Sequence, residues 1–600
     1  MTDSEQPEET RGVTRRQALG MGAAAAGAVA AGSLLRPGSA TAAPPVPVAP
    51  TGTTLAQTLL HGPPGTGGYR HIVTGAGEPT LARTELLAAA PPPVGTRVAL
   101  SAFAQLTDMH IIDAQSPARV EFLDRLNDPG SPVAAQVPFS SAYRPWEMLT
   151  TQIADSMARR VRGLASAAPV SGRAIDFTVC TGDNSDNTQY NELRWHIDLL
   201  DGGKVIRPDS GNLTKWEGVG GPTDWDSSYY HPGGRPFLSK LDNYRAKYGF
   251  PSVPTLHNVC RRPFTSTGLG TDWYSVFGNH DGLVQGTVPS LGVVNAVAVG
   301  NLKVTGLPVG VDVAALLGAI GAGNAAALAT LLTAGPAKLV TADPKRRLLT
   351  RKQTVTEHFN TSGTPVGHGY TSQNVAAGTA YYAFDKGAVH FISLDSCTPT
   401  GYDAGSIDTG QFAWLNAELE ANSSRHLDAT GSWVPSPGTD KLIVLFSHHT
   451  IATMNNPLGV GRVLGPAVQA LLLQYPNVVA WVNGHTHRNQ VLPHARAAGA
   501  AAPGGFWEIN TAAHVDWPSQ SRIVEMVDNS NGTLSIFGTI IDHSAGTTWS
   551  ASLPSQFQLA ALARELSVND PQRDAETAVR DGRRGTITDR NVELLVPTPF

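Results

Sequence analysis

The chain has 600 residues, of which 41% are apolar and 16% are charged, and its formal net charge at pH 7 is -5. A chain of this length and apolar content can bury a large core, and by length alone it could hold roughly two to four domains. The longest basic runs are pairs such as Arg346-Arg347, so the sequence predicts no groove for nucleic acid.

Residues 1–43 have the composition of a targeting segment. Arg15-Arg16 precede a stretch rich in Ala and Gly, and Ala40-Thr41-Ala42 provides an A-x-A cleavage pattern. The segment resembles a twin-arginine export signal. The alternative is a membrane anchor, which needs about twenty strongly apolar residues. We therefore expect no stable transmembrane segment, recognition by the twin-arginine export machinery, and a mature protein that is secreted or held in the cell envelope.

Residues 44–95 are rich in Pro, Gly and Thr and predict an extended segment that wraps the body of the protein. The three cysteines, Cys180, Cys260 and Cys397, allow at most one disulfide bond. Because no C-x-x-C motif is present, neither a zinc ribbon nor a redox pair is predicted. Cys180 lies within an apolar run, which is typical of a buried small hydrophobic residue.

A short apolar run followed at once by a polar cluster recurs five times from residue 96 onward. The five are RVALSAFAQL-TDMH, AIDFTVC-TGDNSD, DWYSVF-GNHD, KLIVLF-SHHT and NVVAWV-NGHTH. Such runs fit strands that are covered on both faces. Helical patterns at 144–164 and 461–476 lie between some of them, and this alternation predicts parallel crossovers with sites at the carboxyl ends of the strands. We therefore expect the five clusters to meet at one rim.

Two long inserts interrupt this pattern, at about 187–271 and 282–353. The first is dense in Gly, Pro and aromatic residues and fits a substrate-shaping lid or a structural flap equally well. The second contains a helical pair at 311–336, which favours core packing or a lid. Two later stretches, TAYYAFDKGAVHFISLDS and RIVEMVDNSNGTLSIFGTIID, predict hairpins. Residues 546–600 predict a C-terminal helical tail without site chemistry.

The five clusters together carry the ligand types that water-activating metal ions prefer: carboxylate, amide oxygen and imidazole. The candidate ligands are Asp108, His110, Asp183, Asn279, His448, His485 and His487. On an extended strand end, residues i and i+2 point the same way, so D-x-H and H-x-H each present two ligands to one side. Taken singly, each cluster is more often a cap or a turn. Their order and their placement after strands carry the prediction.

The series D-x-H, G-D, G-N-H-D, His448 and G-H-x-H resembles the calcineurin-like metallophosphoesterase superfamily over roughly residues 100–545, the inserts excluded. Within it the chain is most similar to exported actinobacterial metallophosphoesterases of unassigned substrate. The resemblance implies an α/β, calcineurin-like four-layer fold, with a central β-sandwich of mixed sheets flanked by helices. It also implies a catalytic domain at 96–545 that contains the two inserts.

The resemblance implies a pair of divalent or trivalent metal ions (Mn, Fe or Zn) bridged by Asp183. One ion would be bound by Asp108, His110, Asp183 and His487, and the other by Asp183, Asn279, His448 and His485. Two ions about 3.5 to 4 Å apart generate a hydroxide at neutral pH and clamp phosphoryl oxygens. Two divalent ions against two ligand carboxylates leave about two positive charges, which favours a phosphate ester anion as the substrate.

The resemblance also implies that His280 is the general acid and that Asp281 orients its imidazole. The alternative for Asp281 is a solvated turn residue. His449 competes with His448 as a ligand, and the family usually binds metal through the first histidine of such a pair. His449 is then left to support the ligands or to contact the substrate.

Three further residues lie near the candidate ligands. Asp113 and Asp186 are either hydrogen-bond partners of the ligands or helix N-caps. His514 follows another apolar run and has no assigned role. Purple acid phosphatases carry a metal-binding Tyr three residues after the bridging Asp, where this chain has Asp186, so a departure from that subfamily is expected.

The sequence thus predicts an exported binuclear-metal hydrolase of a phosphomonoester or phosphodiester. Two alternatives stay open. One is a metal-dependent hydrolase of a carboxylic ester or lactone, which could use similar ligands. The other is a non-catalytic protein that binds phosphate or a phosphopolymer, and it would bind metal tightly without turnover.

Overall fold

The computed structural model describes residues 50–129, 131, 142–222, 224–234, 241–290, 292–321, 324–572 and 582–600. The expected export signal at residues 1–43 lies outside the described residues and stays a prediction. Among the described residues, no helix has both the length and the apolar character needed to cross a membrane.

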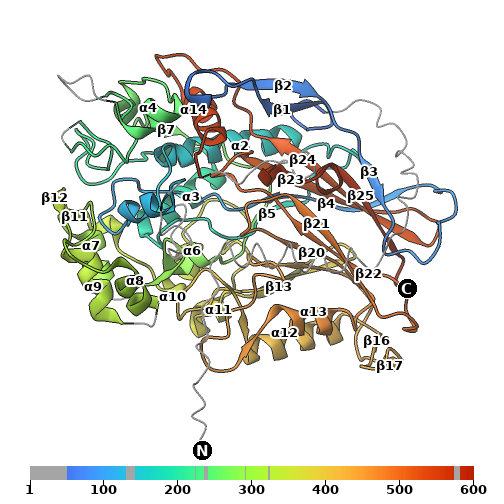
Figure 1. Ribbon diagram of the computed structural model, residues 1–600. Helices are drawn as coiled ribbons and strands as arrows, with labels where there is room; N and C mark the ends of the chain where they lie inside the picture. Colours follow the sequence, from blue (N-terminus) through green and yellow to red (C-terminus); the bar gives the residue numbers. More distant parts are fainter. Residues whose placement is uncertain are drawn as a thin grey trace, which may run out of the picture.

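Two mixed β-sheets lie at the centre of the molecule (Figure 1). The seven-stranded sheet has the order β3-β25-β24-β23-β4-β5-β8, and the six-stranded sheet has the order β13-β14-β18-β20-β22-β21. The first comprises β3 Leu81–Arg83, β4 Val98–Leu106, β5 Phe177–Cys180, β8 Trp273–Ser275, β23 Gln520–Asp528, β24 Thr533–Asp542 and β25 Val592–Pro597. The second comprises β13 Tyr382–Lys386, β14 Val389–Ser393, β18 Leu442–Phe446, β20 Val478–Asn483, β21 Gln490–Ala495 and β22 Gly505–Asn510. The predicted α/β class with mixed sheets is confirmed.

All five apolar runs of the sequence form strands, namely β4, β5, β8, β18 and β20. In the seven-stranded sheet β4, β5 and β8 are parallel neighbours. In the six-stranded sheet β14, β18, β20 and β22 are parallel neighbours. Within each sheet, the carboxyl ends of such strands lie at one edge. The polar clusters that follow them are therefore gathered at the edges of both sheets.

The two sheets pack face to face through an aromatic core. Phe103 and Phe177 of the seven-stranded sheet stack at 5.2 Å, and Phe391 and Phe446 of the six-stranded sheet stack at 5.7 Å. Phe177 meets Phe391 edge to face at 4.9 Å. Offset and edge-to-face pairs of this kind contribute beyond the area that they bury.

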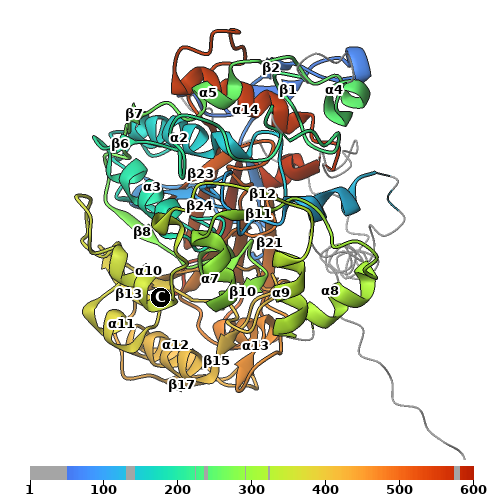
Figure 2. The same ribbon diagram turned by 90° about the vertical axis from the view of Figure 1, so that its left-hand side faces the viewer.

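Helices cover the outer faces of the sheets. Strand β4 alternates Phe103, which faces the aromatic core, with Ala102, Ala104 and Leu106, which face a second core under α2 (Thr150–Leu164) and α3 (Tyr190–Asp201). Helix α14 (Gln556–Val568) packs on α2. On the other side, α12 (Thr409–Ala421) and α13 (Gly465–Leu472) pack on the six-stranded sheet. Figures 1 and 2 show these two groups on opposite sides of the sheets.

The aromatic residues of the first insert are packed in a core. Tyr229, Tyr230, Tyr244 and Phe250 are buried together with Trp146, as the structural-flap alternative predicts. Helix α3 also lies within the predicted limits of this insert, yet it covers the sheet. The other elements of the insert are β6 Val205–Ile206, α4 Asn243–Tyr248, α5 Leu256–Val259 and β7 Phe264–Thr265.

The second insert contains the expected helical pair, α8 (Val313–Gly321) and α9 (Ala325–Thr333), and the two helices pack against each other. Helix α7 (Gly292–Val299) also packs on α9 (Figure 2). The other elements of the insert are β9 Leu283–Val284, β10 Val288–Pro289, β11 Leu302–Val304 and β12 Ala337–Leu339. Between it and the carboxyl-terminal strands lie α10 Arg351–Glu357, α11 Ser372–Ala377, β15 Ile407–Asp408, β16 Arg425–Leu427, β17 Trp433–Pro435 and β19 Arg462–Val463.

Both ends of the described chain contribute to the seven-stranded sheet. The amino-terminal segment forms a hairpin of β1 (Gln57–His61) and β2 (Ile72–Ala76), and then β3 pairs in parallel with β25. Strand β25 lies inside the sheet, between β3 and β24. The predicted C-terminal tail at 546–600 contains its expected helix, α14, and in addition the strand β25, because the apolar run VELLVP returns to the sheet. All three cysteines are buried and free.

We expect Phe391→Ala to lower the free energy of unfolding by about 3–5 kcal/mol, because it opens a cavity between the two sheets. Denaturant unfolding measures this change. The matched control is Phe600→Ala, because Phe600 is 56% exposed, and its effect should stay within about 0.5 kcal/mol. An equal effect of the two substitutions would contradict an inter-sheet core at Phe391.

Candidate metal centre

Loops that follow β4, β5, β8, β18 and β20 carry the candidate ligands, and all seven are buried. Asp108, His110 and His487 place one ligand atom each within 4.8 Å of one another. The Nε2 atom of His487 lies 3.2 Å from Oδ1 of Asp108 and 3.3 Å from Nε2 of His110. These three side chains form one potential metal-binding group.

Asp183 lies between this group and a second one. Its Oδ2 atom is 3.6 Å from Nε2 of His110 and 3.1 Å from Nε2 of His448. The Nε2 atom of His448 in turn lies 3.2 Å from Nδ1 of His485. Asp183 is thus placed as a carboxylate that both groups share.

The hydrogen bonds behind the histidine rings determine which ring nitrogen is free to bind an ion. Nδ1 of His110 faces Asp186 at 2.9 Å, Nδ1 of His487 faces Asp516 at 2.6 Å, and Nδ1 of His448 faces the carbonyl oxygen of Thr181 at 2.9 Å. A ring nitrogen that faces an acceptor carries the proton, so each neutral ring presents a lone pair at Nε2. These lone pairs converge with the carboxylates of Asp108 and Asp183, an arrangement of acceptors that favours a cation.

The pKa directions agree with this picture. Burial lowers the pKa of His110 to about 4, and the nearby His280 acts in the same direction, so the ring of His110 is neutral at pH 7. Burial also acts to lower the pKa of His448, but the carboxylate of Asp183 outweighs it and raises the pKa to about 9. Without a metal ion, a proton therefore binds between these two acceptors.

Asn279 provides one more buried acceptor. Its amide nitrogen donates to the carbonyl oxygen of Gly286 at 3.0 Å, whereas its Oδ1 atom is buried and accepts no hydrogen bond from the described residues. A buried acceptor without a donor costs about 1–3 kcal/mol. A metal ion would satisfy it, so the residues present fit a metal centre.

The backbone at the candidate ligands differs from the expected extended strand end. Asp108, His110, Asp183, His485 and His487 all have a positive φ, between 42° and 69°. Such left-handed residues other than glycine cost on the order of 1–3 kcal/mol each and cluster at functional sites. The expected extended backbone is therefore not found. Asp108 and His110 still lie in one group, as the i, i+2 pattern predicts, whereas the turned backbone sends the ring of His485 toward His448 and that of His487 toward Asp108.

Gly484 permits the close approach that the sequence suggested. A Cβ atom at this position would collide with Oγ1 of Thr107 and would lie 2.5 Å from Oδ2 of Asp108. The backbone N–H of His485, the next residue, donates to both oxygens of Asp108 at 3.1 and 3.0 Å. The glycine thus lets the loop after β20 bind the carboxylate that follows β4.

His280 is the most exposed side chain of the centre, at 16%. Its backbone N–H donates to Oδ1 of Asp183 at 2.8 Å. Its Nδ1 atom lies 2.9 Å from the carbonyl oxygen and 3.2 Å from the carboxylate of Asp186. Burial acts to lower the pKa of His280, but Asp183 and Asp186 outweigh it and raise the pKa, which favours the protonated ring.

The expected pairing of Asp281 with the His280 imidazole is wrong. The carboxylate of Asp281 accepts from the backbone N–H groups of Gly278 at 3.0 Å and of Asn184 and Ser185 at 3.1 and 3.0 Å. Asp281 is the third residue of the single-turn helix α6 (Asn279–Gly282), and an acidic side chain there folds back on the helix start. It is buried, so it is not a solvated turn residue either.

Asp186 is a partner of the candidate ligands, and Asp113 is not in contact with them. One oxygen of Asp186 faces both His110 and His280, and the other accepts from Arg119. The carboxylate of Asp113 accepts from Asn191 and Ser210, at 2.7 Å each, and lies beside Arg346.

The two remaining histidines have local partners. Both ring nitrogens of His449 have partners at 2.8 Å, Oγ of Ser396 and the carbonyl oxygen of Asp403, although its ring lies close enough to His448 and His485 to join them at an ion. Nε2 of His514 lies 2.6 Å from Oγ of Ser521.

The sequence reasoning missed Asp516, which pairs with His487. The residue follows β22, which is a further parallel strand next to β20 in the six-stranded sheet. The residue before Asp516 contacts the first polar cluster: the backbone N–H of Val515 donates to the carbonyl oxygen of Asp108 at 3.3 Å. The available signal was its position after an apolar run, the same signal that identified the other five clusters.

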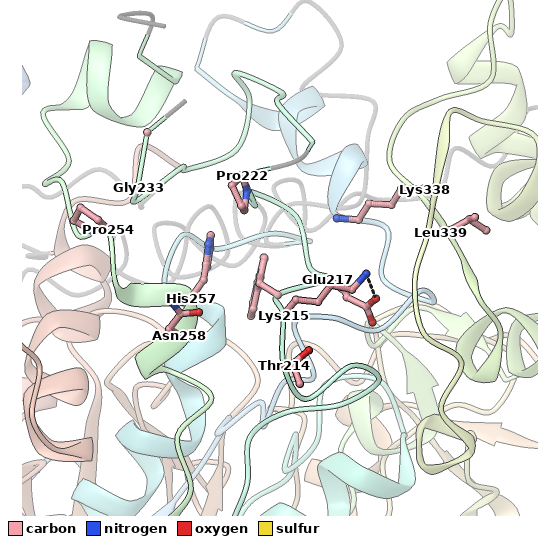
Figure 3. A pocket seen from close by; sticks show the side chains of 13 residues that line it. Thr214, Lys215, Glu217, Pro222, Gly233, Pro254, His257, Asn258, Lys338 and Leu339 are labelled. Carbon is pink, nitrogen blue, oxygen red and sulfur yellow. Dashed lines mark ion pairs between the residues drawn. The ribbon is translucent and has the colours of Figure 1, made fainter. Parts of the chain in front are cut away.

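A cavity of about 340 Å³ lies between the two inserts (Figure 3). Residues of the first insert line most of it, and Lys338 and Leu339 of the second insert line the rest; none of the candidate ligands does. Lys215 pairs with Glu217 at 3.2 Å, and Lys338 pairs with Asp224 at 2.5 Å. Because both lysines are paired with carboxylates, the cavity shows no built phosphate site.

No protein-family model and no curated protein matches the sequence. Among solved structures, the chain is similar to a dimetal phosphatase from Danio rerio, with 11% identity, a TM-score of 0.27, and coverage of 74% of this chain and 100% of that one. It is also similar to a purple acid phosphatase from yellow lupin (Lupinus luteus) seeds, with 8% identity, a TM-score of 0.26, and coverage of 78% of this chain and 55% of that one. Similarities of this size do not place the chain in a family.

We expect Gly484→Ala to weaken binding of Mn²⁺ at least tenfold, because the added methyl group displaces Thr107 and Asp108. Isothermal titration of metal-free protein measures the affinity. The matched control is Gly163→Ala, because Gly163 lies in α2 and has open space around its Cβ position, so Mn²⁺ affinity should be unchanged. Equal affinities in the two variants would contradict the close approach at residue 484.

Proposed function

We propose that the chain is an exported, binuclear-metal phosphoesterase of the calcineurin-like metallophosphoesterase type, which hydrolyses a phosphomonoester or a phosphodiester. One observation carries this proposal: buried ligand atoms from the loops after β4, β5, β18 and β20 lie close together around Asp183. The order of these acceptors along the chain agrees with the superfamily that the sequence resembles. The calcineurin-like four-layer arrangement is part of the proposal, and the helices on the outer faces of the two sheets support it.

One cation would be held by Asp108, His110, Asp183 and His487. The other would be held by Asp183, Asn279, His448 and His485. This mixture of carboxylate, amide and imidazole suits Mn, Fe or Zn. When bound, the pair of ions polarises phosphoryl oxygens and acidifies water for attack at neutral pH.

His280 is suited to protonate the leaving oxygen. Asp186 accepts from Nδ1 and so directs the proton at Nε2 toward the centre, where Nε2 lies 3.9 Å from Oδ2 of Asp183. The two nearby carboxylates favour the protonated ring. Its greater exposure supports this role, because a substrate would approach the centre from its exposed side.

The experiment compares metal content and phosphoester turnover in His280→Ala and Asp183→Asn. His280→Ala should keep two ions per chain and lose about 10²- to 10⁴-fold in kcat on alkyl phosphoesters, because only the acid is removed. The loss should be smaller with p-nitrophenyl leaving groups, which need little protonation. Asp183→Asn should lose metal as well as activity. Metal analysis by mass spectrometry and steady-state kinetics measure these outcomes.

The matched control is His426→Ala, because His426 is bound to Ser436 and stacked on Tyr475, outside the centre, and activity should be unchanged. Faster turnover of p-nitrophenyl acetate than of any phosphoester would favour the ester hydrolase alternative. Tight metal binding without turnover of any phosphoester would favour the binding-protein alternative.

Export is the part of the proposal that rests on residues 1–43. The test is expression in a bacterial host with a functional twin-arginine machinery. The wild-type precursor should be shortened and recovered outside the cytoplasm, whereas a variant with both Arg15→Lys and Arg16→Lys should stay inside at full length. Arg11→Lys lies outside the pair and is the control, for which export should be normal. Normal export of the double variant would contradict this part of the proposal.

A further inference from the structure

The two histidines of the Asp108 group differ from His448 and Asn279 in what supports them. Behind His487 lies Asp516, at 2.6 Å from Nδ1, and behind His110 lies Asp186, at 2.9 Å from Nδ1. Each ring therefore has a carboxylate on one side and its free Nε2 lone pair on the other. Carboxylate support of this kind fixes the ring orientation and raises the basicity of the ligand nitrogen.

The two carboxylates belong to one charged network, which consists of Asp516, Arg144, Glu147, Arg119 and Asp186. Arg144 binds Asp516 through Nε at 2.7 Å and Nη2 at 3.2 Å. Glu147 accepts from the backbone N–H of Arg144 at 3.0 Å and from Nη2 of Arg119 at 2.8 Å. Arg119 then donates to Asp186.

This charged network is fully buried, since each of its side chains is at most 4% exposed. The network connects His487 to His110 through the carboxylates behind the two rings. The Nε2 atoms of these rings lie 3.3 Å apart. Because buried ion pairs are held in one geometry and are little screened by solvent, both rings are fixed from behind by the same rigid structure. Arg583 adds a second cation at Asp516.

The second group has neutral partners at two of its ligands. The ring of His448 is held by the carbonyl oxygen of Thr181 at 2.9 Å, and the amide of Asn279 is held by the carbonyl oxygen of Gly286 at 3.0 Å. A backbone carbonyl orients a ligand, but it raises the basicity of an imidazole less than a carboxylate does. The two sites of the proposed centre are therefore supported unequally.

We propose that the site formed by Asp108, His110, Asp183 and His487 binds its metal ion more tightly than the neighbouring site, and that Asp516 is a positioning residue responsible for this difference. The inference rests on the proposed two-metal centre. The charged network fixes the ring orientations of His110 and His487 before an ion binds. The tighter site therefore binds its ion first. The site with Asn279 and His448 fills second and exchanges its ion more readily.

The test is a titration of metal-free protein with Mn²⁺, followed by calorimetry and by electron paramagnetic resonance. The wild type should bind two ions with affinities at least tenfold apart. Asp516→Asn should weaken the tighter site about 10- to 100-fold, as loss of such support does elsewhere, and leave the weaker site within about threefold. Asn279→Ala should weaken only the weaker site, which identifies the two.

Asp209→Asn is the matched control, because Asp209 is also a buried aspartate bound to an arginine, Arg261 at 3.0 Å, but it supports no candidate ligand. Its two affinities should equal those of the wild type. If Asp516→Asn does not fold, as judged by circular dichroism, Glu147→Gln takes its place, and it should weaken the tighter site several-fold through the charged network.

Two equal affinities in the wild type would overturn the inference, as would equal weakening of both sites by Asp516→Asn or an effect no larger than that of Asp209→Asn. The readout is metal affinity and not turnover. If two unequal sites are found without phosphoester hydrolysis, the proposed function fails and the inference stands. If hydrolysis is found but Asp516→Asn matches the control, the inference alone fails. A wild type that binds no ion overturns both.

Discussion

The convergence of buried acceptors around Asp183 is the constraint on which the rest of the structure depends. The carboxylates of Asp108 and Asp183 lie 3.1 to 3.6 Å from ring nitrogens of His110, His448 and His487. The rings of His110 and His487 also face each other, at 3.3 Å. Buried polar groups without donors cost several kcal/mol, and facing acceptors repel each other. The surrounding fold must hold them in place, and the proposed pair of cations would convert this cost into binding energy.

The two sheets hold these buried acceptors in place because they supply loops from opposite sides of one core. The loops that follow β4, β5 and β8 come from the seven-stranded sheet, and those that follow β18 and β20 come from the six-stranded sheet. The distance between the sheets is set by the stacked rings of Phe103, Phe177, Phe391 and Phe446. The position of the shared carboxylate therefore depends on the aromatic core between the sheets.

The sequence predicted the five strands and the placement of the candidate ligands directly after them, because both signals are local. Each ligand follows an apolar run at once, so its place at the end of a strand is determined by its position in the sequence. The partners of the ligands were harder to predict, because they come from distant segments. Asp186 rather than Asp281 meets His280, since a single-turn helix folds the Asp281 carboxylate back onto Gly278. Asp516 is 29 residues from His487, and the pairing follows only from the adjacency of β20 and β22.

The same reasoning explains why strand β25 and the left-handed ligands escaped prediction. A short apolar run after a charged stretch does not indicate which strands it will pair with, and β25 is identified by its pairing with β24 and β3. The left-handed φ of Asp108 and Asp183 is imposed by contacts across the centre, such as the hydrogen bonds to Asp108 from the loop after β20. A local rule for extended chains cannot anticipate a backbone that is held by tertiary contacts.

The charged network and Arg583 connect the centre to segments that are far apart in the sequence, and this bears on when metal binds. Asp516 is held by Arg144, which precedes α2, and by Arg583, which precedes β25, so the support of His487 is complete only after the carboxyl-terminal strand has joined its sheet. Ions that bind the folded state alone stabilise it in proportion to the logarithm of their concentration over Kd. A protein exported by the twin-arginine route leaves the cytoplasm already folded. If that route is correct for this chain, the tighter site is complete, and able to hold its ion, before export begins.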